Sequence, residues 1–122
     1  PKNRCFVEQR AKALGIQDQI SVHRDLDSIS SVLFDTVICL DVLEHLPDPS
    51  KQLEIFLEKL SPNGIALMNW YFYKGDNGEY PFHFDDPEMV QKFFFTLQSS
   101  YIELFHPFLI TTRAYKPLEK IN

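Results

Sequence analysis

The sequence predicts an α/β fold built around a mostly parallel sheet, and three observations support this prediction. Val37–Leu40 is an unbroken apolar run rich in β-branched residues, which is typical of a strand buried on both faces of a parallel sheet. Two Asp-Pro pairs each precede an amphipathic stretch with helical spacing. Helix-like and strand-like stretches alternate along the chain, as they do where parallel strands are joined by helical crossovers.

The first third of the chain is expected to form a helix, a short strand and a short helical turn. Cys5–Leu14 carries apolar residues at helical spacing, and Gly15 is placed to end that helix. Ile20–Val22 is a short strand candidate, followed by a polar loop. Ser28–Leu33 is expected to form a helical turn before the central strand, Phe34–Leu40.

The middle of the chain is expected to form a helix, a tight turn, a second apolar strand and a long loop. Asp48-Pro49 combines a capping residue with a proline at the first helical position. Ser61–Gly64 has the composition of a turn, and Ile65–Trp70 is the second strand. Tyr71–Phe84 is an aromatic, irregular segment whose length indicates a lid or a substrate loop.

The last third repeats the Asp-Pro helix start at Asp86-Pro87 and ends in two strand-like segments, Tyr101–Phe105 and Leu109–Tyr115. These two segments are expected to form a closing antiparallel hairpin. With 122 residues, the chain suffices for a single domain, residues 1–122, and hardly for two.

Composition narrows the classes of function. The net charge is −5 and no basic run is present, which argues against a dedicated nucleic-acid binder. The two cysteines, Cys5 and Cys39, form no disulfide framework. No apolar run reaches membrane-spanning length and no signal peptide is visible, so a cytoplasmic protein without a membrane partner is expected.

Ionisable residues follow the central strand directly. Asp41 comes where the strand should end, and Glu44 and His45 lie three and four residues later. Any helical turn there would place all three on one face. Ligands of open α/β sheets bind beyond the carboxyl ends of the strands, so the sequence predicts a ligand site here.

The same stretch carries a family resemblance. Phe34–Pro49 reads Phe-Asp-Thr-Val-Ile-Cys-Leu-Asp-Val-Leu-Glu-His-Leu-Pro-Asp-Pro and resembles the fourth strand and following loop of class I S-adenosylmethionine-dependent methyltransferases. The match is nearest to the branch of small-molecule O-methyltransferases, such as those of ubiquinone synthesis. Leu60–Leu67 looks like the turn and fifth strand of that family.

The resemblance implies a Rossmann-like methyltransferase sheet with strand order 3-2-1-4-5-7-6. This chain would supply strands 3 to 7, with the closing antiparallel hairpin, and would lack the first two strands. The implied cofactor is S-adenosylmethionine. Asp25 and Leu26 would lie at its adenine, while Asp41 and Val42 would lie at its methionine portion. His45 is the expected catalytic residue.

One element of the family pattern is absent from the sequence. The four glycines form no Gly-x-Gly, although a nucleotide-type cofactor needs such a loop for close backbone approach. We expect the chain to be the carboxyl-terminal part of a longer methyltransferase acting on a small molecule. The alternative is a non-catalytic, methyltransferase-like binding or scaffold module. A different nucleotide enzyme of Rossmann topology is a weaker alternative.

Several residues keep alternative interpretations. Asp25 could be an ordinary loop carboxylate, and Asp41 could serve as the N-cap of the turn that starts at Val42. Glu44 and His45 could position or deprotonate a substrate, could join Asp41 in a metal site with His83 as a later ligand, or could only satisfy loop backbone groups. The site prediction therefore assigns no metal ligand.

The implied strand order also predicts an exposed edge. Without strands 1 and 2, the central strand would have an unpaired side, which is a template for self-association. Pairing of Ile20–Val22 with the central strand, a second copy of the chain, or upstream residues could each cover that edge.

Overall fold

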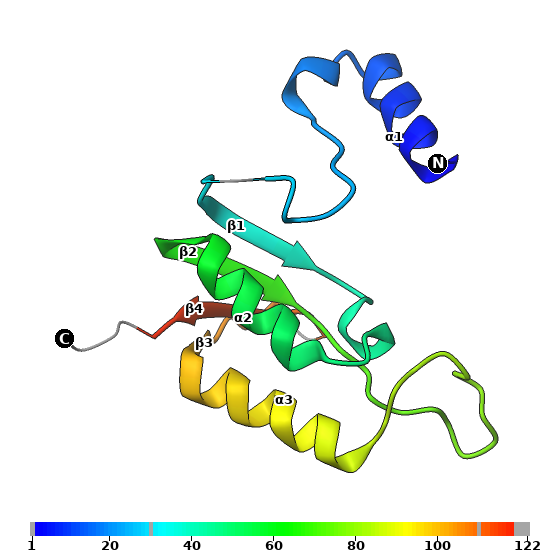
Figure 1. Cartoon of the computed structure of the whole chain (residues 1–122), viewed down its shortest axis with the longest axis vertical. Coiled ribbons are helices and arrows are strands. Elements are labelled where there is room, and N and C mark those ends of the chain that lie inside the picture. Colours follow the sequence, from blue (N-terminus) through cyan, green and yellow to red (C-terminus); the bar gives the residue numbers. More distant parts are fainter. Residues whose placement is uncertain (1, 30, 110, 119–122) are drawn as a thin grey trace. The chain divides into compact units, whose positions relative to one another are not determined.

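The computed structural model describes residues 2–29, 31–109 and 111–118, and Figure 1 shows its elements along the chain. Contacts divide the chain into two compact units, Pro1–Val32 and Leu33–Asn122. The prediction of a single domain over residues 1–122 stays a prediction. In the first unit lie helix α1 (Lys2–Ala13) and the 3₁₀ turn η1 (Gln17–Gln19); in the second lie β1 (Phe34–Cys39), the 3₁₀ turn η2 (Leu43–His45), α2 (Pro49–Lys59), β2 (Leu60–Met68), α3 (Pro87–Ser100), β3 (Tyr101–Leu104) and β4 (Arg113–Pro117).

Helix α1 ends as its sequence predicts. Gly15 has a φ of +68°, a left-handed conformation that glycine adopts without steric cost. Its N–H donates to the carbonyl of Lys12, and the N–H of Ile16 donates to the carbonyl of Ala11. These two bonds are those of a Schellman motif, which satisfies the last carbonyls of a helix.

Two predictions for the rest of the first unit are wrong. Ile20 has extended φ and ψ, but Ile20–Val22 is not a strand because none of the described strands pairs with it. Ser28–Leu33 is not helical, since the Asp25 carboxylate accepts the Ser28 N–H at 2.9 Å and closes a local turn instead. Ser30 lies outside the described residues.

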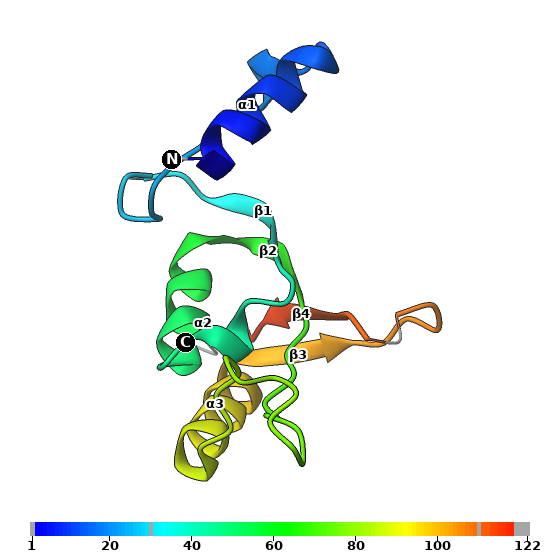
Figure 2. The ribbon, with the colours of Figure 1, turned by 90° about the vertical axis from the view of Figure 1, so that its right-hand side faces the viewer.

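The second unit contains a four-stranded sheet with the order β1-β2-β4-β3. Strands β1 and β2 are parallel, while β4 runs antiparallel to both β2 and β3. Figure 2 shows that the β3–β4 hairpin lies on the side of the sheet opposite β1. This order equals 4-5-7-6 in the implied family sheet, so the predicted fold class and closing hairpin are confirmed. The last strand begins at Arg113 rather than Leu109, and Ile110 lies outside the described residues.

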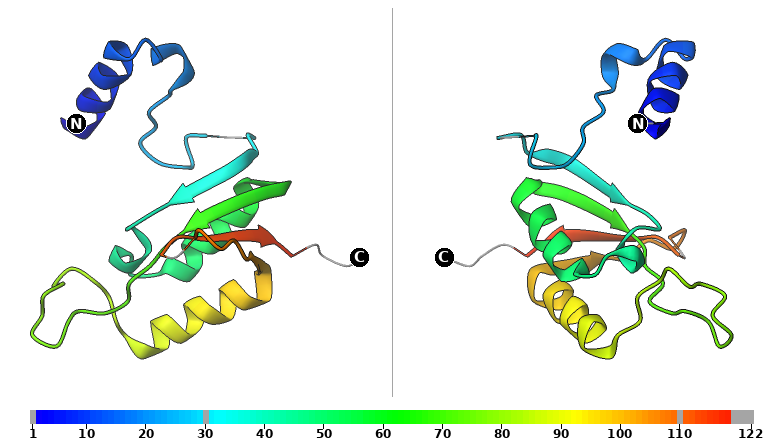
Figure 3. Two further views of the ribbon diagram at one scale, coloured as in Figure 1. Left: turned by 180° about the vertical axis from the view of Figure 1, so that it is seen from behind. Right: turned by 45° about the vertical axis from the view of Figure 1, so that its right-hand side comes forward.

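Helices α2 and α3 lie side by side on one face of this sheet, as Figures 1 and 3 show. Between the helices and the sheet, Leu53, Phe93 and Met68 are fully buried. The hydroxyl of Tyr101 donates to the carbonyl of Leu53 at 2.7 Å, which ties the start of β3 to α2. Burial raises the pKa of that Tyr101 hydroxyl, so it stays a proton donor.

The predicted burial of the central strand on both faces is wrong for this unit. Cys39 is buried, but Ile38 is 65% exposed. Successive side chains of a strand point to opposite faces, and α2 and α3 cover only one face. Ile38 therefore emerges on the face that these helices leave open.

The turn predicted at Ser61–Gly64 takes the form of an irregularity inside β2. Phe34 pairs with Leu60 and Thr36 pairs with Ile65, so the intervening β2 residues bulge out of the ladder. A Cβ atom on Gly64 would come within 3.0 Å of the Phe34 carbonyl oxygen. The turn-forming residues Ser61–Gly64 therefore form a bulge within β2 rather than a turn before it.

Both Asp-Pro helix starts are confirmed. The Asp48 carboxylate accepts the Lys51 N–H at 3.1 Å, and the Asp86 carboxylate accepts the Met89 N–H at 2.9 Å. Asp48 also pairs with Lys92 of α3 at 3.0 Å. The hydrogen bond from Lys92, followed by that from the Lys51 backbone, holds the pKa of the Asp48 carboxyl below its usual range.

We expect Asp48→Ala to lower the free energy of unfolding by about 1 kcal/mol, the usual cost of losing an N-cap. Asp48→Asn keeps a capping oxygen and loses the charge toward Lys92, and exposed ion pairs contribute little. Its cost should therefore be smaller. Urea unfolding of the full chain near neutral pH measures both, and equal costs would contradict the capping role.

The stabilisation that the Asp48 carboxylate contributes through Lys51 and Lys92 should depend on pH. Because the pKa of Asp48 is lowered by folding, its stabilisation is complete above the unfolded-state pKa of about 3.9 and is lost as pH falls through the folded-state value. The stability gap between the chain and Asp48→Asn should be constant above about pH 5 and should narrow in stronger acid. A gap that persists in strong acid would contradict this assignment.

The edge of β1 leads to a further prediction. Among the described strands, β1 pairs with β2 alone, so the isolated chain should self-associate through its free edge. Light scattering should show a mass that rises with concentration. Ile38→Lys should reduce the association, whereas Gln91→Lys, which adds the same charge on an exposed position of α3, should not. A monomer at all concentrations would contradict this prediction.

Candidate functional site

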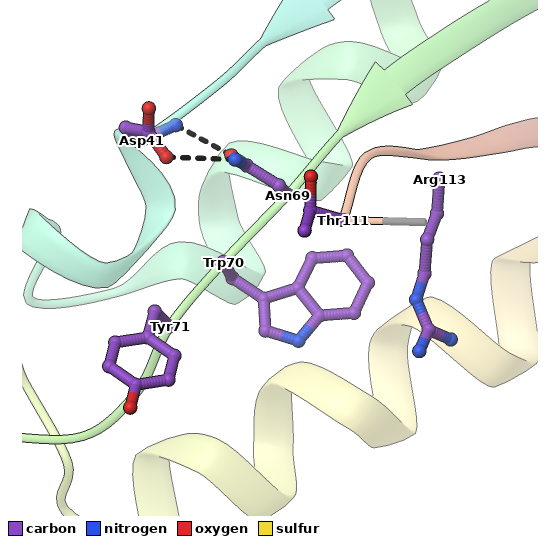
Figure 4. Close-up of a pocket in the computed structure, with 6 residues that line it drawn as sticks. All are labelled: Asp41, Asn69, Trp70, Tyr71, Thr111 and Arg113. Atoms are coloured by element: carbon purple, nitrogen blue, oxygen red, sulfur yellow. Dashed lines mark hydrogen bonds between the residues drawn. The ribbon is translucent and has the colours of Figure 1, made fainter. Parts of the chain in front are cut away.

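The parallel pairing of β1 and β2 brings two polar residues together where the strands end. The N–H of Asp41 donates to the side-chain oxygen of Asn69 at 2.6 Å, and the Asn69 amide donates to the Asp41 carboxylate at 2.8 Å. Figure 4 shows this reciprocal pair. Asn69 was not among the predicted site residues, because it was expected to lie inside the strand Ile65–Trp70. The feature that identified Asp41 could also have identified Asn69, because each is a polar residue directly after an apolar strand.

The interpretation of Asp41 as an N-cap is wrong. The N-cap of η2 is Val42, and no side chain caps that turn. Asp41 has a φ of +54°, a left-handed conformation in which Asp is one of the more tolerated residues. Its carboxylate is therefore directed to Asn69, and one carboxylate oxygen carries that bond.

An open cleft of about 380 Å³ lies at this end of the sheet. In Figure 4, the indole of Trp70 lies between the side chains of Tyr71 and Arg113. The Arg113 guanidinium is 3.4 Å from the Glu103 carboxylate. Polar groups beside aromatic rings suit a ligand with a charged part and a flat or apolar part. The cleft is lined by Asp41, Asn69, Trp70, Tyr71, Thr111 and Arg113.

A larger groove of about 810 Å³ lies at the opposite end of the sheet. Leu33 and Leu60, near the starts of β1 and β2, are part of its mostly apolar lining. Ligands of open α/β sheets bind outside the carboxyl ends of the strands. The smaller cleft is therefore the better candidate site.

Glu44, His45 and His83 form a second group close to this end of the sheet. One ligand-type atom from each residue lies within 4.8 Å of the other two. The rings of His45 and His83 meet edge to face, with centroids 4.7 Å apart. Asp41 is not part of this group, so the alternative interpretation that joined it to Glu44 and His45 in a metal site is wrong. The reason is that its side chain pairs with Asn69.

The aromatic segment Tyr71–Phe84 is irregular, as predicted, and packs partly on itself. Tyr80 stacks on His83 with ring centroids 5.0 Å apart, and Tyr71 meets Tyr80 edge to face at 5.4 Å. His83 is thus a packed residue as well as a polar one. The role of this segment as a lid or substrate loop stays a prediction.

Cys39 lies at the end of β1 and is buried. Burial, together with the negative charge of Glu44, raises the pKa of its thiol to about 11. The thiol is therefore neutral near pH 7 and behaves as a small apolar side chain, as expected.

The predicted site residues fall into both units. Asp41, Val42 and His45 belong to the second unit, at the end of β1. Asp25 and Leu26 belong to the first unit, where the carbonyl of Leu26 accepts the Ile29 N–H at 3.1 Å. The Asp25 carboxylate is exposed and accepts the Ser28 N–H, which is consistent with the alternative of an ordinary loop carboxylate. Its contact with a cofactor stays a prediction.

Comparisons with known proteins point to methyltransferases. No protein-family model matches the chain. Over 36 residues, the chain is 39% identical to the ubiquinone biosynthesis O-methyltransferase of Pasteurella multocida (strain Pm70), a match covering 30% of the chain and 15% of that relative. The fold is similar to that of a Clostridium thermocellum protein provisionally assigned as an rRNA methylase, with a TM-score of 0.60 and 18% identity. That likeness covers 92% of this chain and 65% of the other.

These findings define the class of fold. The chain has an α/β fold shared with a methylase, and its four described strands follow the 4-5-7-6 part of the order implied by its resemblance to class I methyltransferases. The resemblance is confirmed at this level, and the small-molecule branch stays a prediction. Among the described residues, every helix is too short or too polar to cross a membrane.

The Asp41–Asn69 pair should stabilise the ends of β1 and β2. We expect Asn69→Ala to lower the free energy of unfolding by about 1 kcal/mol, because two hydrogen bonds are lost at a partly exposed position. Asn63→Ala, which changes an exposed residue of the bulge, serves as the matched control and should cost less than about 0.5 kcal/mol. Equal costs in urea unfolding would show that the pair does not hold the strand ends.

Proposed function

We propose that this chain forms part of a methyltransferase that transfers a methyl group from S-adenosylmethionine to a small-molecule acceptor. The observation that carries the proposal is the polar cleft at the carboxyl ends of β1 and β2, formed around Asp41 and Asn69. The similarity to an O-methyltransferase of ubiquinone synthesis supports it. The match covers a small part of that relative, so the acceptor and the activity belong to the proposal.

The residues present fit the methionine end of this cofactor. Asp41 offers a carboxylate oxygen beyond the one bonded to Asn69, and a methionine portion carries an ammonium group that such an oxygen can accept from. Asn69 would hold that carboxylate in place, and Val42 would contact the same portion. Asp25 and Leu26 are proposed for the adenine. The chain contains no Gly-x-Gly, so its residues account for only part of a cofactor site.

The chemistry makes modest demands on the protein. When bound, the cofactor supplies a methyl group that its sulfonium already activates. The chain must then orient the acceptor and exclude water, for which the aromatic side chains beside the cleft are suited. If the acceptor is a hydroxyl, His45 is proposed to take its proton. The Nδ1 atom of His45 lies 3.1 Å from the Phe82 carbonyl oxygen, so Nε2 would be the basic atom.

We propose a small molecule rather than RNA as the acceptor, because the chain is acidic and its cleft has little positive charge. The chain carries a net charge of −5, and Arg113 is the cationic residue that lines the cleft. Binding of RNA requires several phosphate contacts from Lys and Arg. A cytoplasmic location remains part of this proposal. The alternative, a non-catalytic methyltransferase-like module, is motivated by the lack of Gly-x-Gly.

Calorimetry with S-adenosylhomocysteine on the natural full-length protein tests the proposal. We expect binding, and we expect Asp41→Ala to weaken it about tenfold or more, because hydrogen bonds to a charged group contribute about 1.5–3 kcal/mol. Asp18→Asn, in η1, is the matched control and should bind as the unaltered protein does. Absence of binding by the unaltered protein would refute the proposal and favour the non-catalytic alternative.

A further inference from the structure

Two residues of the candidate cleft, Trp70 and Arg113, also line a second, smaller hollow of about 300 Å³. That hollow lies between α3 and the β3–β4 hairpin, and Glu103 and Tyr115 are part of its lining. The two hollows therefore adjoin each other at Trp70 and Arg113. A ligand in the cleft that contains Asp41 can reach both of these side chains.

The indole of Trp70 is held in one orientation by the aromatic side chains around it. It meets Phe93 and Phe94 of α3 edge to face, with ring centroids 5.1 and 5.9 Å away. The ring of Tyr115 on β4 lies 5.9 Å from it. Phe93 is fully buried, so these contacts anchor the indole to the core, while Trp70 itself is only partly buried. A fixed and partly exposed indole offers a flat surface on which an aromatic ring can stack.

The guanidinium of Arg113 is only weakly paired with an acid. Its Nη1 atom lies 3.4 Å from each carboxylate oxygen of Glu103, whereas charge-assisted hydrogen bonds are about 2.7–2.9 Å long. The side chains of Arg113 and Glu103 are 52% and 45% exposed, and exposed ion pairs contribute little. Because a guanidinium carries five N–H donors, Arg113 can bind an anion beside or in place of Glu103.

The negative and positive groups of the cleft lie apart. In Figure 4, Asp41 and Arg113 are on opposite sides of the cleft, and the indole of Trp70 lies between them. The proposed function assigns Asp41 to the ammonium group of the cofactor, so Arg113 is left for the acceptor. A carboxylate suits one guanidinium, because its two oxygens match the fork of N–H donors. A doubly charged phosphate would need more positive charge than one arginine beside Glu103 supplies.

We propose that the cleft binds an aromatic acid as its small-molecule acceptor, with the carboxylate on Arg113 and the ring against the indole of Trp70. This assignment rests on the proposed methyltransferase function, whose acceptor it specifies. Trp70 would fix the plane of the ring, and Arg113 would fix its direction, so that the end away from the carboxylate points to the Asp41 side of the cleft. Orienting the acceptor in this way is what the transfer of an already activated methyl group requires from the protein.

Fluorescence of the full chain tests this assignment, because Trp70 is its single tryptophan. We expect 3-hydroxybenzoate to change the fluorescence saturably. The alcohol 3-hydroxybenzyl alcohol, which has the same ring without the charge, should bind at least about tenfold more weakly, because a hydrogen bond to a charged group is lost. Equal affinities for the acid and the alcohol, or no saturable change with the acid, would overturn the proposal. This comparison needs no variant.

Two variants locate the carboxylate. Arg113→Gln should remove the preference for the acid and should leave the weaker binding of the alcohol unchanged. Arg10→Gln, which removes the same charge from an exposed position of α1, is the matched control and should keep the preference. A preference for the acid that survives in Arg113→Gln would contradict the assignment.

The methionine portion of the cofactor also carries a carboxylate, and calorimetry on the natural full-length protein separates the two sources. Arg113→Gln should bind S-adenosylhomocysteine as tightly as the unaltered protein does. A weaker affinity would assign Arg113 to the cofactor and would overturn the proposal. Binding of 3-hydroxybenzoate without any binding of S-adenosylhomocysteine would instead refute the methyltransferase function and would support the aromatic-acid site by itself.

Discussion

The parallel pairing of β1 and β2 is the constraint on which the candidate site depends. The last pair of the ladder joins Cys39 to Met68, so both strands end at the same level of the sheet. The next polar residues on each strand, Asp41 and Asn69, then meet and exchange two hydrogen bonds. A shift of this register would separate the two side chains, and the cleft would lose the carboxylate that the proposed function requires.

Glu44 connects this sheet end to the loop that follows β2. Its carbonyl accepts the N–H of Phe84, its negative charge contributes to the raised pKa of Cys39, and its buried Oε2 has no partner. Glu44 therefore holds the loop through its backbone carbonyl and keeps one carboxylate oxygen buried without a hydrogen-bond partner among the described residues.

Features that depend on a few neighbouring residues could be predicted from the sequence. Features that depend on contacts between distant residues could not. The Asp-Pro helix starts and the end of α1 at Gly15 are properties of a few neighbouring residues, and the structure confirms them. The strand predicted at Ile20–Val22 is not formed because a strand needs a partner, and the composition of three residues does not show whether one is present. The turn composition at Ser61–Gly64 was recognised, but its use as a bulge depends on the pairing of Phe34 with Leu60. The Asp41–Asn69 pair joins residues 28 positions apart, and only sheet register brings them together. The sequence offered His83 only as a later ligand in one alternative, because loop hydrogen bonds determine its position.

The most direct test of this account asks which end of the sheet binds the ligand. Amide chemical shifts of the isotopically labelled full-length protein, recorded by NMR with and without S-adenosylhomocysteine, report contact residue by residue. The account predicts that the amides of Asp41, Val42 and Asn69 shift on addition of the ligand. Shifts confined to Leu33, Leu60 and the rest of the larger groove at the opposite end, or no shifts at all, would contradict it.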